Sequence, residues 1–366
     1  MPEVTAQQKY ACPACGAAAE WNPAKQSLVC PYCSTVSPAQ LAVDGSNVVE
    51  NDLATALRNL GDDQRGWQAE KISVKCQNCQ AVSVFDATRV GQRCDFCGSA
   101  SLIPVEQIQA PIRPECLLEF KLAETQVRDL VRSWYGSRWF APNSLKAGAL
   151  TDTVSGVYIP YWTFDAQAHA DWTAESGYSY WDNESYTDSN GRLQTRRVQK
   201  IRWEPSSGAL DHFFDDELVP ASRGVEEKLL RKIEPFPTTT SLKPYDPGFL
   251  AGWVVEQYQI DLIAAAQRSR EIMEKKIRDL CDAEVPGDIH RNLDVTSDFS
   301  AQTFKHILVP IWLLAYTYRT ASYQLVANGY TGVIAGRYPL SWFKIALAVL
   351  AALFAIWLVL FIAGSH

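Results

Sequence analysis

Eight of the ten cysteines in this 366-residue chain occur as four Cys-x2-Cys pairs, and this pattern constrains the fold more than any other feature. The first two pairs are Cys12, Cys15, Cys30 and Cys33, and the last two are Cys76, Cys79, Cys94 and Cys97. Both sets read C-x2-C-x14-C-x2-C, with a constant offset of 64 residues. A short hairpin can bring two such pairs together as a tetrahedron of thiolates around zinc. The spacing predicts zinc ribbons at residues 8–37 and 72–102.

The predicted zinc ions are structural, because four thiolates leave no coordination position open for a substrate. The alternative is a pair of redox-active Cys-x2-Cys motifs. The duplication favours zinc, since Trp21 and Phe85 occupy equivalent positions inside the two sets. Gly16 and Gly98 each follow a knuckle cysteine, where a tight turn needs a positive φ. The remaining cysteines, Cys116 and Cys281, lie in apolar surroundings typical of core residues.

The segment between the ribbons predicts a short spacer helix within residues 48–66. Leu53, Leu57 and Leu60 fall on one helical face, and Gly61 ends the pattern.

Residues 105–340 are interpreted as one α+β domain with an internal repeat. The run Val157–Phe164 resembles Ile307–Leu314, 150 residues later, and both are apolar and rich in β-forming residues. Each run contains one proline, which favours edge strands or bulges. Helices are expected at Glu124–Ser137 and Asp261–Asp282. The core stripe expected for the second helix is Ile272, Met273, Ile277 and Leu280.

Four features of the middle domain have both a functional and a structural interpretation. The aromatic-rich run 158–186 is either a binding surface or, as is more usual in strands, core. Alternation places four basic residues on one strand face, which fits either a phosphate ligand or a solvated edge. They are Arg192, Arg196, Lys200 and Arg202. A second mixture of basic and aromatic residues lies at 128–139. Helix packing with cation–π contacts accounts for it as well as binding to nucleic acid would.

The fourth feature is His212, which stands near Asp211, Asp215 and Asp216 and is a weak acid–base or metal candidate. The sequence contains no Walker A, GxSxG or HExxH motif. We therefore expect no enzymatic activity.

Residues 342–363 are predicted to form one C-terminal transmembrane helix. Every residue from Ile345 to Ala363 is apolar, and this length at ~1.5 Å per residue approaches the thickness of a bilayer core. Arg319, Arg337 and Lys344 precede the span, and no Lys or Arg follows it. The positive-inside rule and the need for reduced thiolates both place the N-terminal part in the cytoplasm. The expected localisation is therefore the inner membrane, with a single pass.

The twin ribbons, the phrases VYIPYWTFDAQ and HILVPIWLLAYTYR, and the apolar tail resemble a group of bacterial membrane-anchored tandem zinc-ribbon proteins. Members of this group are often labelled primosomal or helicase-like. Some similar proteins look like membrane partners of phage-shock-protein-A and SPFH-type envelope-stress proteins. The resemblance implies a bilayer anchor and a protein partner of one of these two types.

These observations predict a non-enzymatic, tail-anchored zinc-ribbon adaptor that recruits or scaffolds proteins at the cytoplasmic face of the inner membrane. The alternative is a nucleic-acid-binding zinc-ribbon membrane protein. The net charge is −7, and residues 1–110 contain 8 Lys and Arg against 11 Asp and Glu. Because binding to nucleic acid usually requires a basic surface, a nucleic-acid partner is not expected.

Overall fold

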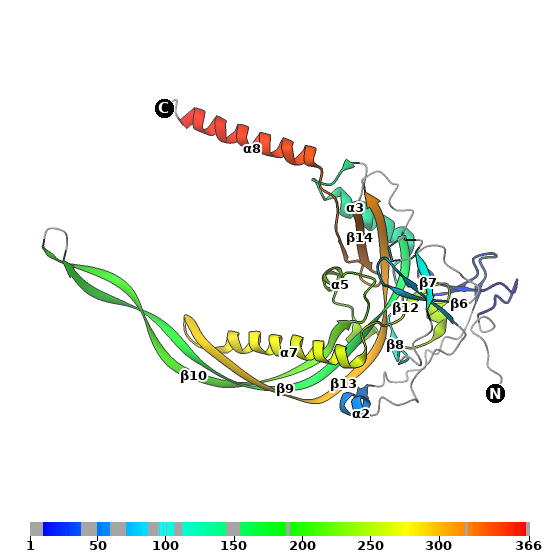
Figure 1. Cartoon of the computed structure of the whole chain (residues 1–366), viewed down its shortest axis with the longest axis horizontal. Helices are drawn as coiled ribbons and strands as arrows, with labels where there is room; N and C mark the ends of the chain where they lie inside the picture. Colours follow the sequence, from blue (N-terminus) through cyan, green and yellow to red (C-terminus); the bar gives the residue numbers. More distant parts are fainter. Residues whose placement is uncertain are drawn as a thin grey trace.

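The computed structural model describes most of the chain and has a mixed α+β fold. It describes residues 10–37, 50–58, 71–86, 94, 96–97, 99, 101–105, 112–143, 154–187, 191–318 and 321–363. In Figure 1 the molecule is a crescent, in which a β-rich body carries two projections. One projection is a long curved arm of strands, and the other is the C-terminal helix.

Two long strands form the centre of the main sheet. They are β9 (Val154–Thr187) and β13 (Ile289–Tyr318), and they pair antiparallel with Pro310 opposite Tyr158. The two similar runs of the sequence are therefore neighbours in space. The expectation that their prolines mark edge strands or bulges is wrong.

Each proline instead lies where its strand changes partners. Near Pro160, β9 exchanges β10 (Leu193–Pro220) for the parallel strand β12 (Val254–Glu256). Near Pro310, β13 exchanges the parallel strand β8 (Cys116–Leu117) for β14 (Ala321–Asn328). Because the ladder is interrupted at these points, a residue without an N–H is tolerated inside the sheet.

The two halves of the middle region share one order of elements. The first half runs β8, α3 (Glu124–Gly136), β9 and β10, and the second runs β12, α7 (Leu262–Glu284), β13 and β14. Each short first strand pairs in parallel with a long strand of the other half. The halves are thereby interlocked. Smaller elements complete the body: α5 (Glu227–Ile233), α6 (Thr238–Ser241), β11 (Lys243–Pro244), the 3-10 helix η3 (Pro247–Leu250) and β15 (Ile334–Gly336).

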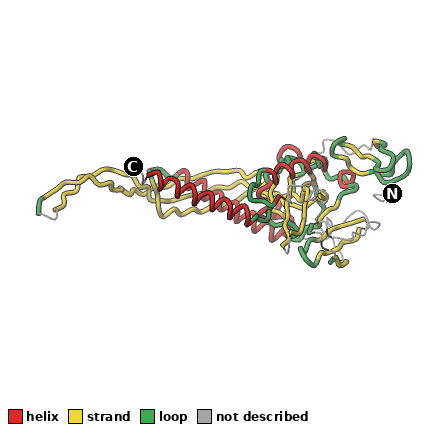
Figure 2. The backbone as a smooth tube through the Cα atoms, turned by 90° about the horizontal axis from the view of Figure 1, so that it is seen from above, coloured by secondary structure: helices red, strands yellow, loops and turns green. Residues whose placement is uncertain are grey.

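The arm consists of β9, β10 and the first part of β13, and α7 packs along one face of it (Figures 1 and 2). Alternate residues of β9 form a buried stripe of small side chains beneath the helix, with one tryptophan: Ala166, Ala168, Ala170, Trp172 and Ala174. Met273, Ile277 and Cys281 of α7 lie against this stripe. The expected stripe of α7 is therefore correct for Met273 and Ile277, but Leu280 is exposed and Cys281 replaces it.

The predicted spacer helix is described only in part. After β4 (Asn51–Asp52), which pairs with β13, helix α2 covers Leu53–Arg58. Leu53 is buried and Leu57 is partly exposed, while Leu60 and Gly61 lie outside the described residues.

The expectation of a transmembrane helix at residues 342–363 requires correction. Helix α8 covers Trp342–Ala363, and its side chains are described as far as Trp357. Among the described residues, no helix combines the length and the hydropathy that crossing a membrane demands. The expected single-pass inner-membrane localisation, and the transmembrane anchor on which it rests, are therefore wrong.

Lys344, at the start of α8, has a different role from the interfacial anchor that a membrane helix would need. Its ammonium group donates to the carbonyl oxygens of Trp139 and Ala141 at 3.0 and 2.7 Å, and to Asn143 at 2.7 Å. It thus fixes the beginning of α8 to the segment that follows α3.

Candidate metal centres

All four Cys-x2-Cys knuckles have the same local backbone geometry where they are described. The first cysteine of each knuckle donates its N–H to the residue five positions later, as Cys12 does to Ala17 at 2.7 Å. The backbone N–H of the residue after the second cysteine donates to the carbonyl oxygen of the first cysteine, at 2.8–2.9 Å. This residue has positive φ in three knuckles, at Gly16, Ser34 and Gln80. Gly98, the fourth equivalent, lies outside the described residues.

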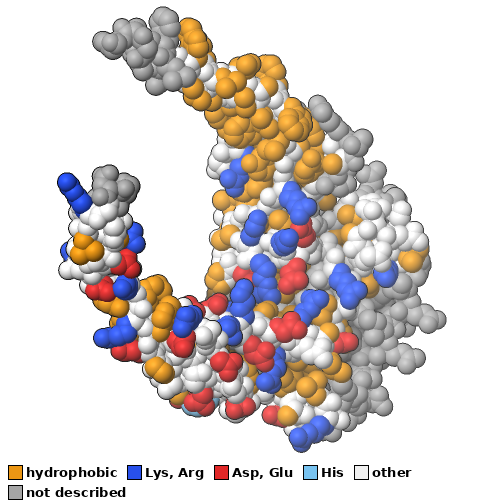
Figure 3. Space-filling model, turned by 60° about the vertical axis from the view of Figure 1, so that its left-hand side comes forward, with side chains coloured by type: hydrophobic (Ala, Val, Ile, Leu, Met, Phe, Trp, Pro, Cys, Tyr) orange, Lys and Arg blue, Asp and Glu red, His pale blue; other side chains and the backbone are white. Residues whose placement is uncertain are grey.

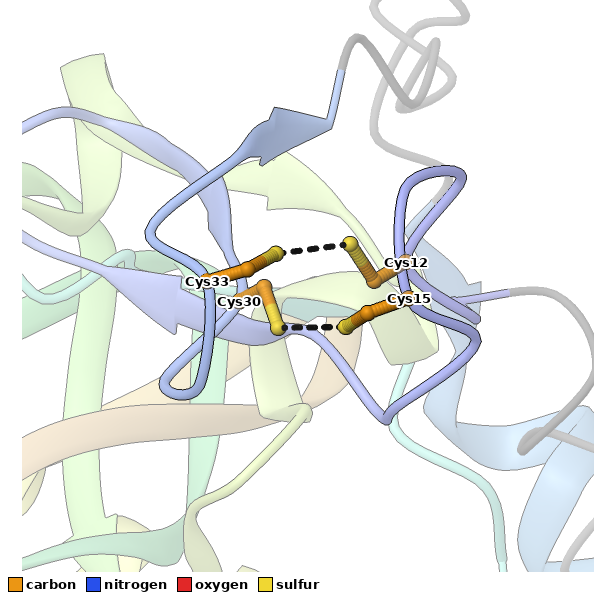
Figure 4. Close-up of side chains that lie close together, drawn as sticks. All are labelled: Cys12, Cys15, Cys30 and Cys33. Atoms are coloured by element: carbon orange, nitrogen blue, oxygen red, sulfur yellow. Dashed lines mark hydrogen bonds between the residues drawn. The ribbon is translucent and has the colours of Figure 1, made fainter.

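These turns bring the eight predicted cysteines together as two groups of four. In the first group the closest sulfurs are Cys12–Cys33 at 3.4 Å and Cys15–Cys30 at 3.5 Å (Figure 4). In the second group they are Cys76–Cys97 at 3.5 Å and Cys79–Cys94 at 3.6 Å. Sulfurs placed 2.3 Å from a tetrahedral zinc ion would be about 3.8 Å apart, so both groups fit zinc. The closest contacts join different knuckles, whereas a redox motif would oxidise within one Cys-x2-Cys pair.

The electrostatics of the second group also favour a bound cation. When the four thiols interact only with one another, the hydrogen bond between Cys79 and Cys94 lowers the pKa of Cys94 to about 5. The same hydrogen bond raises the pKa of Cys79. Four thiolates at this spacing need a divalent ion to remain charged together. Zinc would be held by these eight sulfurs, and it would supply folding energy without opening a position for chemistry.

Ribbon 1 forms a small separate sheet that is docked onto the body. Its strands are β1 (Glu20–Asn22), β2 (Ser27–Val29) and β3 (Val36–Ser37). Trp21 packs edge-on against Phe249 with ring centroids 4.8 Å apart, and its backbone N–H donates to the carbonyl oxygen of Ala251. The hydroxyl of Tyr10 donates to Asp246 at 2.9 Å. Ribbon 1 therefore contacts residues 245–253, and its Tyr10, Trp21 and Leu28 also share a buried cluster with Phe120 and Leu308 of the body.

Ribbon 2 is continuous with the main sheet. Its strands are β5 (Lys71–Cys76), β6 (Val82–Asp86) and β7 (Leu102–Val105), and β6 pairs with β12. Cys76, Cys94 and Phe96 are at most 3% exposed and belong to the same hydrophobic cluster as Ile159 and Ile307. The second group of cysteines is thus embedded in the core of the body.

Sequence reasoning found only part of a third group of ionisable residues, at the root of the arm. Asp215 and Asp216, which the sequence placed beside His212, lie instead with Asp165 at a bulge of β10. The Lys305 ammonium already lies 2.8 Å from Asp216 and 3.2 Å from Glu50, so a cation of the chain itself occupies this group. We therefore assign no metal here. The signal available in the sequence was the lysine just before the apolar run of β13.

The other candidates from the sequence separate in the structure. His212 packs against the ring of Phe214, while Asp211 points to the opposite face and pairs with His169 at 2.8 Å. In the aromatic run, Tyr158 and Trp162 are buried, and Tyr180 and Trp181 are exposed. The run is therefore core in the body and surface at the end of the arm.

The basic residues at the end of the arm are paired with nearby side chains. Arg196 bonds Glu184 at 2.8 Å, and Lys200 bonds Asp182 at 2.7 Å. Arg197 lies over the ring of Trp181 with 5.0 Å between the guanidinium carbon and the ring centroid. These residues form an exposed mixture of cations and aromatic rings.

The chain is 24% identical over 257 residues to YdjG, an uncharacterised protein of Bacillus subtilis (strain 168), and the match covers 67% of this chain and 69% of that protein. No family model matches the chain, and no solved structure gives a significant match.

Proposed function

We propose that this protein is a non-enzymatic adaptor that holds other proteins on the surfaces of its arm and zinc ribbons. The arm is the observation that carries the proposal. Three strands of 28 to 34 residues continue outward from the sheet with one face on α7 and the other exposed. Such an extended surface suits binding to macromolecules better than it suits the enclosure of a small substrate.

The zinc sites support the same proposal. Both groups are closed sets of four cysteines, so the zinc ions would stabilise surfaces without taking part in chemistry. Among the described residues, Asp211 pairs with His169, and Asp215 and Asp216 group with Asp165, so the aspartates that made His212 a catalytic candidate have other partners. The resemblance noted from the sequence supplies a partner class, which is a protein of the phage-shock-protein-A or SPFH type.

A direct binding experiment tests this proposal. The full chain, purified with zinc, is immobilised and exposed to the purified phage-shock-protein-A-like and SPFH-type proteins of the same organism, with nuclease present. We expect one of them to bind, and Cys76→Ser to abolish the binding. The matched control is Cys116→Ser, because Cys116 is buried but belongs to neither group.

Nucleic-acid binding is the second candidate, and the exposed cations and rings at the end of the arm favour it. Under that alternative the full chain binds single-stranded DNA or RNA, with an affinity that falls steeply as salt rises. Salt-sensitive binding of this kind, without a protein partner that survives nuclease, would replace the adaptor proposal.

A further inference from the structure

The last part of the arm is a two-stranded hairpin that extends beyond its supports. Strand β13 begins at Ile289, opposite Gly177, and α7 ends at Glu284. Beyond this point only β9 and β10 continue, and they pair in register as far as Leu193 and Thr187. We call residues 178–187 and 191–203 the tip. A two-stranded hairpin is marginally stable alone in water, so a covering partner would stabilise the tip.

The tip exposes large apolar side chains. Trp181 is 57% exposed and Leu193 is 77% exposed, and Ile201 is also exposed. These three residues occupy odd-numbered positions of β9 and β10. No register shift interrupts the β9–β10 ladder between this region and Asp211. They therefore lie on the face that is opposite to α7, which we call the outer face.

The outer face changes character along the arm. Nearer the body it carries four exposed aspartates around His169, namely Asp171, Asp211, Asp294 and Asp298. At the tip, from the Ser179–Ile201 pair to the Thr187–Leu193 pair, the described outer face contains no carboxylate. Its charged residue is Arg197, which stacks on Trp181. One half of this face is thus acidic, and the other is apolar and cationic.

The net charges of the two regions follow the same division. The sequence of the hairpin end, 177–203, contains five Lys and Arg and three Asp and Glu. Of the four cations within the β9–β10 ladder, Arg197 lies on the outer face, and Arg196, Lys200 and Arg202 lie on the other face. The three strand segments that follow toward the body, 165–176, 204–215 and 291–302, contain eight Asp and Glu and one arginine. Figure 3 shows charged side chains of both signs along the arm. Opposite charges at two places on one face make that face complementary to a rotated copy of itself.

We propose that the arm is a dimerisation device, in which two copies pack antiparallel through their outer faces. The tip of each copy then covers the acidic half of the other. Arg197 lies against the aspartates. The side chains of Trp181 and Leu193 are removed from water because they pack against the exposed ring of Phe213. The arrangement is isologous and closed, and it packs sheet on sheet. A nucleic acid fits this face less well, because the aspartates would repel its phosphates.

Two charge-reversal variants of the full chain test the proposal. The tip variant is Arg197→Glu, and the acidic-half variant is Asp171→Lys with Asp298→Lys. Each variant alone places like charges opposite each other. We expect the dimer dissociation constant, measured by analytical ultracentrifugation at low salt, to rise at least about tenfold for each. Mixing the two variants restores opposite charges at both contacts, so a heterodimer should form with nearly the wild-type affinity.

The mixing step also shows that the variants are folded, and it separates the arm from other self-association. The control variants are Arg132→Glu and Asp129→Lys, an exposed pair on α3 that we expect to leave the affinity unchanged. Wild-type dimers that weaken as salt rises, together with rescue on mixing, support the proposal. A wild-type monomer, or variants that associate like the wild type, would overturn it. It would also fail if the tip variant loses binding to single-stranded DNA while dimerisation is unchanged.

Discussion

The two zinc ribbons have the same ligand spacing but different relations to the rest of the molecule. Ribbon 1 has its own three-stranded sheet, and its Tyr10, Trp21 and Leu28 share a core cluster with the body that does not include its cysteines. Ribbon 2 contributes its strands to the main sheet, and Cys76 and Cys94 are themselves part of the core. The difference shows that a duplicated motif can join the body by packing of its apolar side chains in one place and as strands of the main sheet in another.

The largest expected effect is the loss of ribbon 2. Replacing Cys76 with Ser should remove one zinc ion and destabilise the whole body, because β6 and the core cluster around Ile159 depend on that ribbon. Structural zinc contributes roughly 10 kcal/mol or more to folding in small zinc domains, which equals the stability of many whole proteins. We expect the main cooperative thermal transition to be lost or shifted strongly downward, as measured by circular dichroism.

The matched variant is Cys30→Ser in ribbon 1. It should also leave one zinc ion per chain, down from two, while the main transition changes little. Metal analysis and thermal unfolding measured on the same samples decide the matter. Equal damage from both variants would mean that the two ribbons are equally integrated.

A second, smaller difference should appear in the rate of zinc removal. The first cysteine of every knuckle is buried in both ribbons, but the second cysteines differ. Cys15 and Cys33 of ribbon 1 are exposed, whereas Cys79 and Cys97 of ribbon 2 are only partly so. A chelator should therefore remove zinc in two phases, with the fast phase belonging to ribbon 1. We expect rates that differ by about tenfold or more, because reaching ribbon 2 requires opening of the core. In the Cys30→Ser variant the fast phase should be absent, and a single fast phase there would contradict the assignment.

The sequence predicted the two groups of four cysteines well because their information is local. Two residues between paired cysteines, and a residue tolerant of positive φ after them, define a knuckle without reference to the rest of the chain. The pairing of β6 with β12 depends instead on Val84 meeting Val255 across 170 positions of sequence. No local pattern carries that contact, and so the integration of ribbon 2 could not be predicted.

The length of the arm was missed for a related reason. In β9 the buried stripe is made of alanines, which are poor strand formers and give little periodic signal. Small side chains are favoured at these positions of β9 because α7 packs closely against them. The apolar tail illustrates the opposite error, since composition alone predicted a membrane span that the described part of α8 does not provide.

The docking of ribbon 1 can be tested at Trp21. Truncation to Ala removes the contact with the Phe249 ring and leaves the sulfurs of the knuckles in place. Removing a buried tryptophan costs about 3–5 kcal/mol, which should loosen the ribbon from residues 245–253. Hydrogen exchange should then increase in β1 and η3 but remain unchanged in β6, with both zinc ions retained. Loss of zinc from ribbon 1 would show instead that its fold depends on docking.

The smallest expected effect concerns the turn after each second cysteine. Ser34 and Gln80 both have positive φ, at 58° and 65°, where a side chain is unfavourable and glycine is not. Ser34→Gly should therefore stabilise ribbon 1, by about 0.5 kcal/mol after the extra entropy of glycine in the unfolded chain is subtracted. Gln80→Gly should gain less, because it loses the bond from the Gln80 amide to the Gln77 carbonyl at 2.7 Å.

Chelation rates resolve such small differences, since each ribbon has its own phase. Slower release of zinc from ribbon 1 in Ser34→Gly, and faster release in Gly16→Ala, are the expected results. The reverse order would mean that contacts of the Ser34 side chain outweigh the backbone strain.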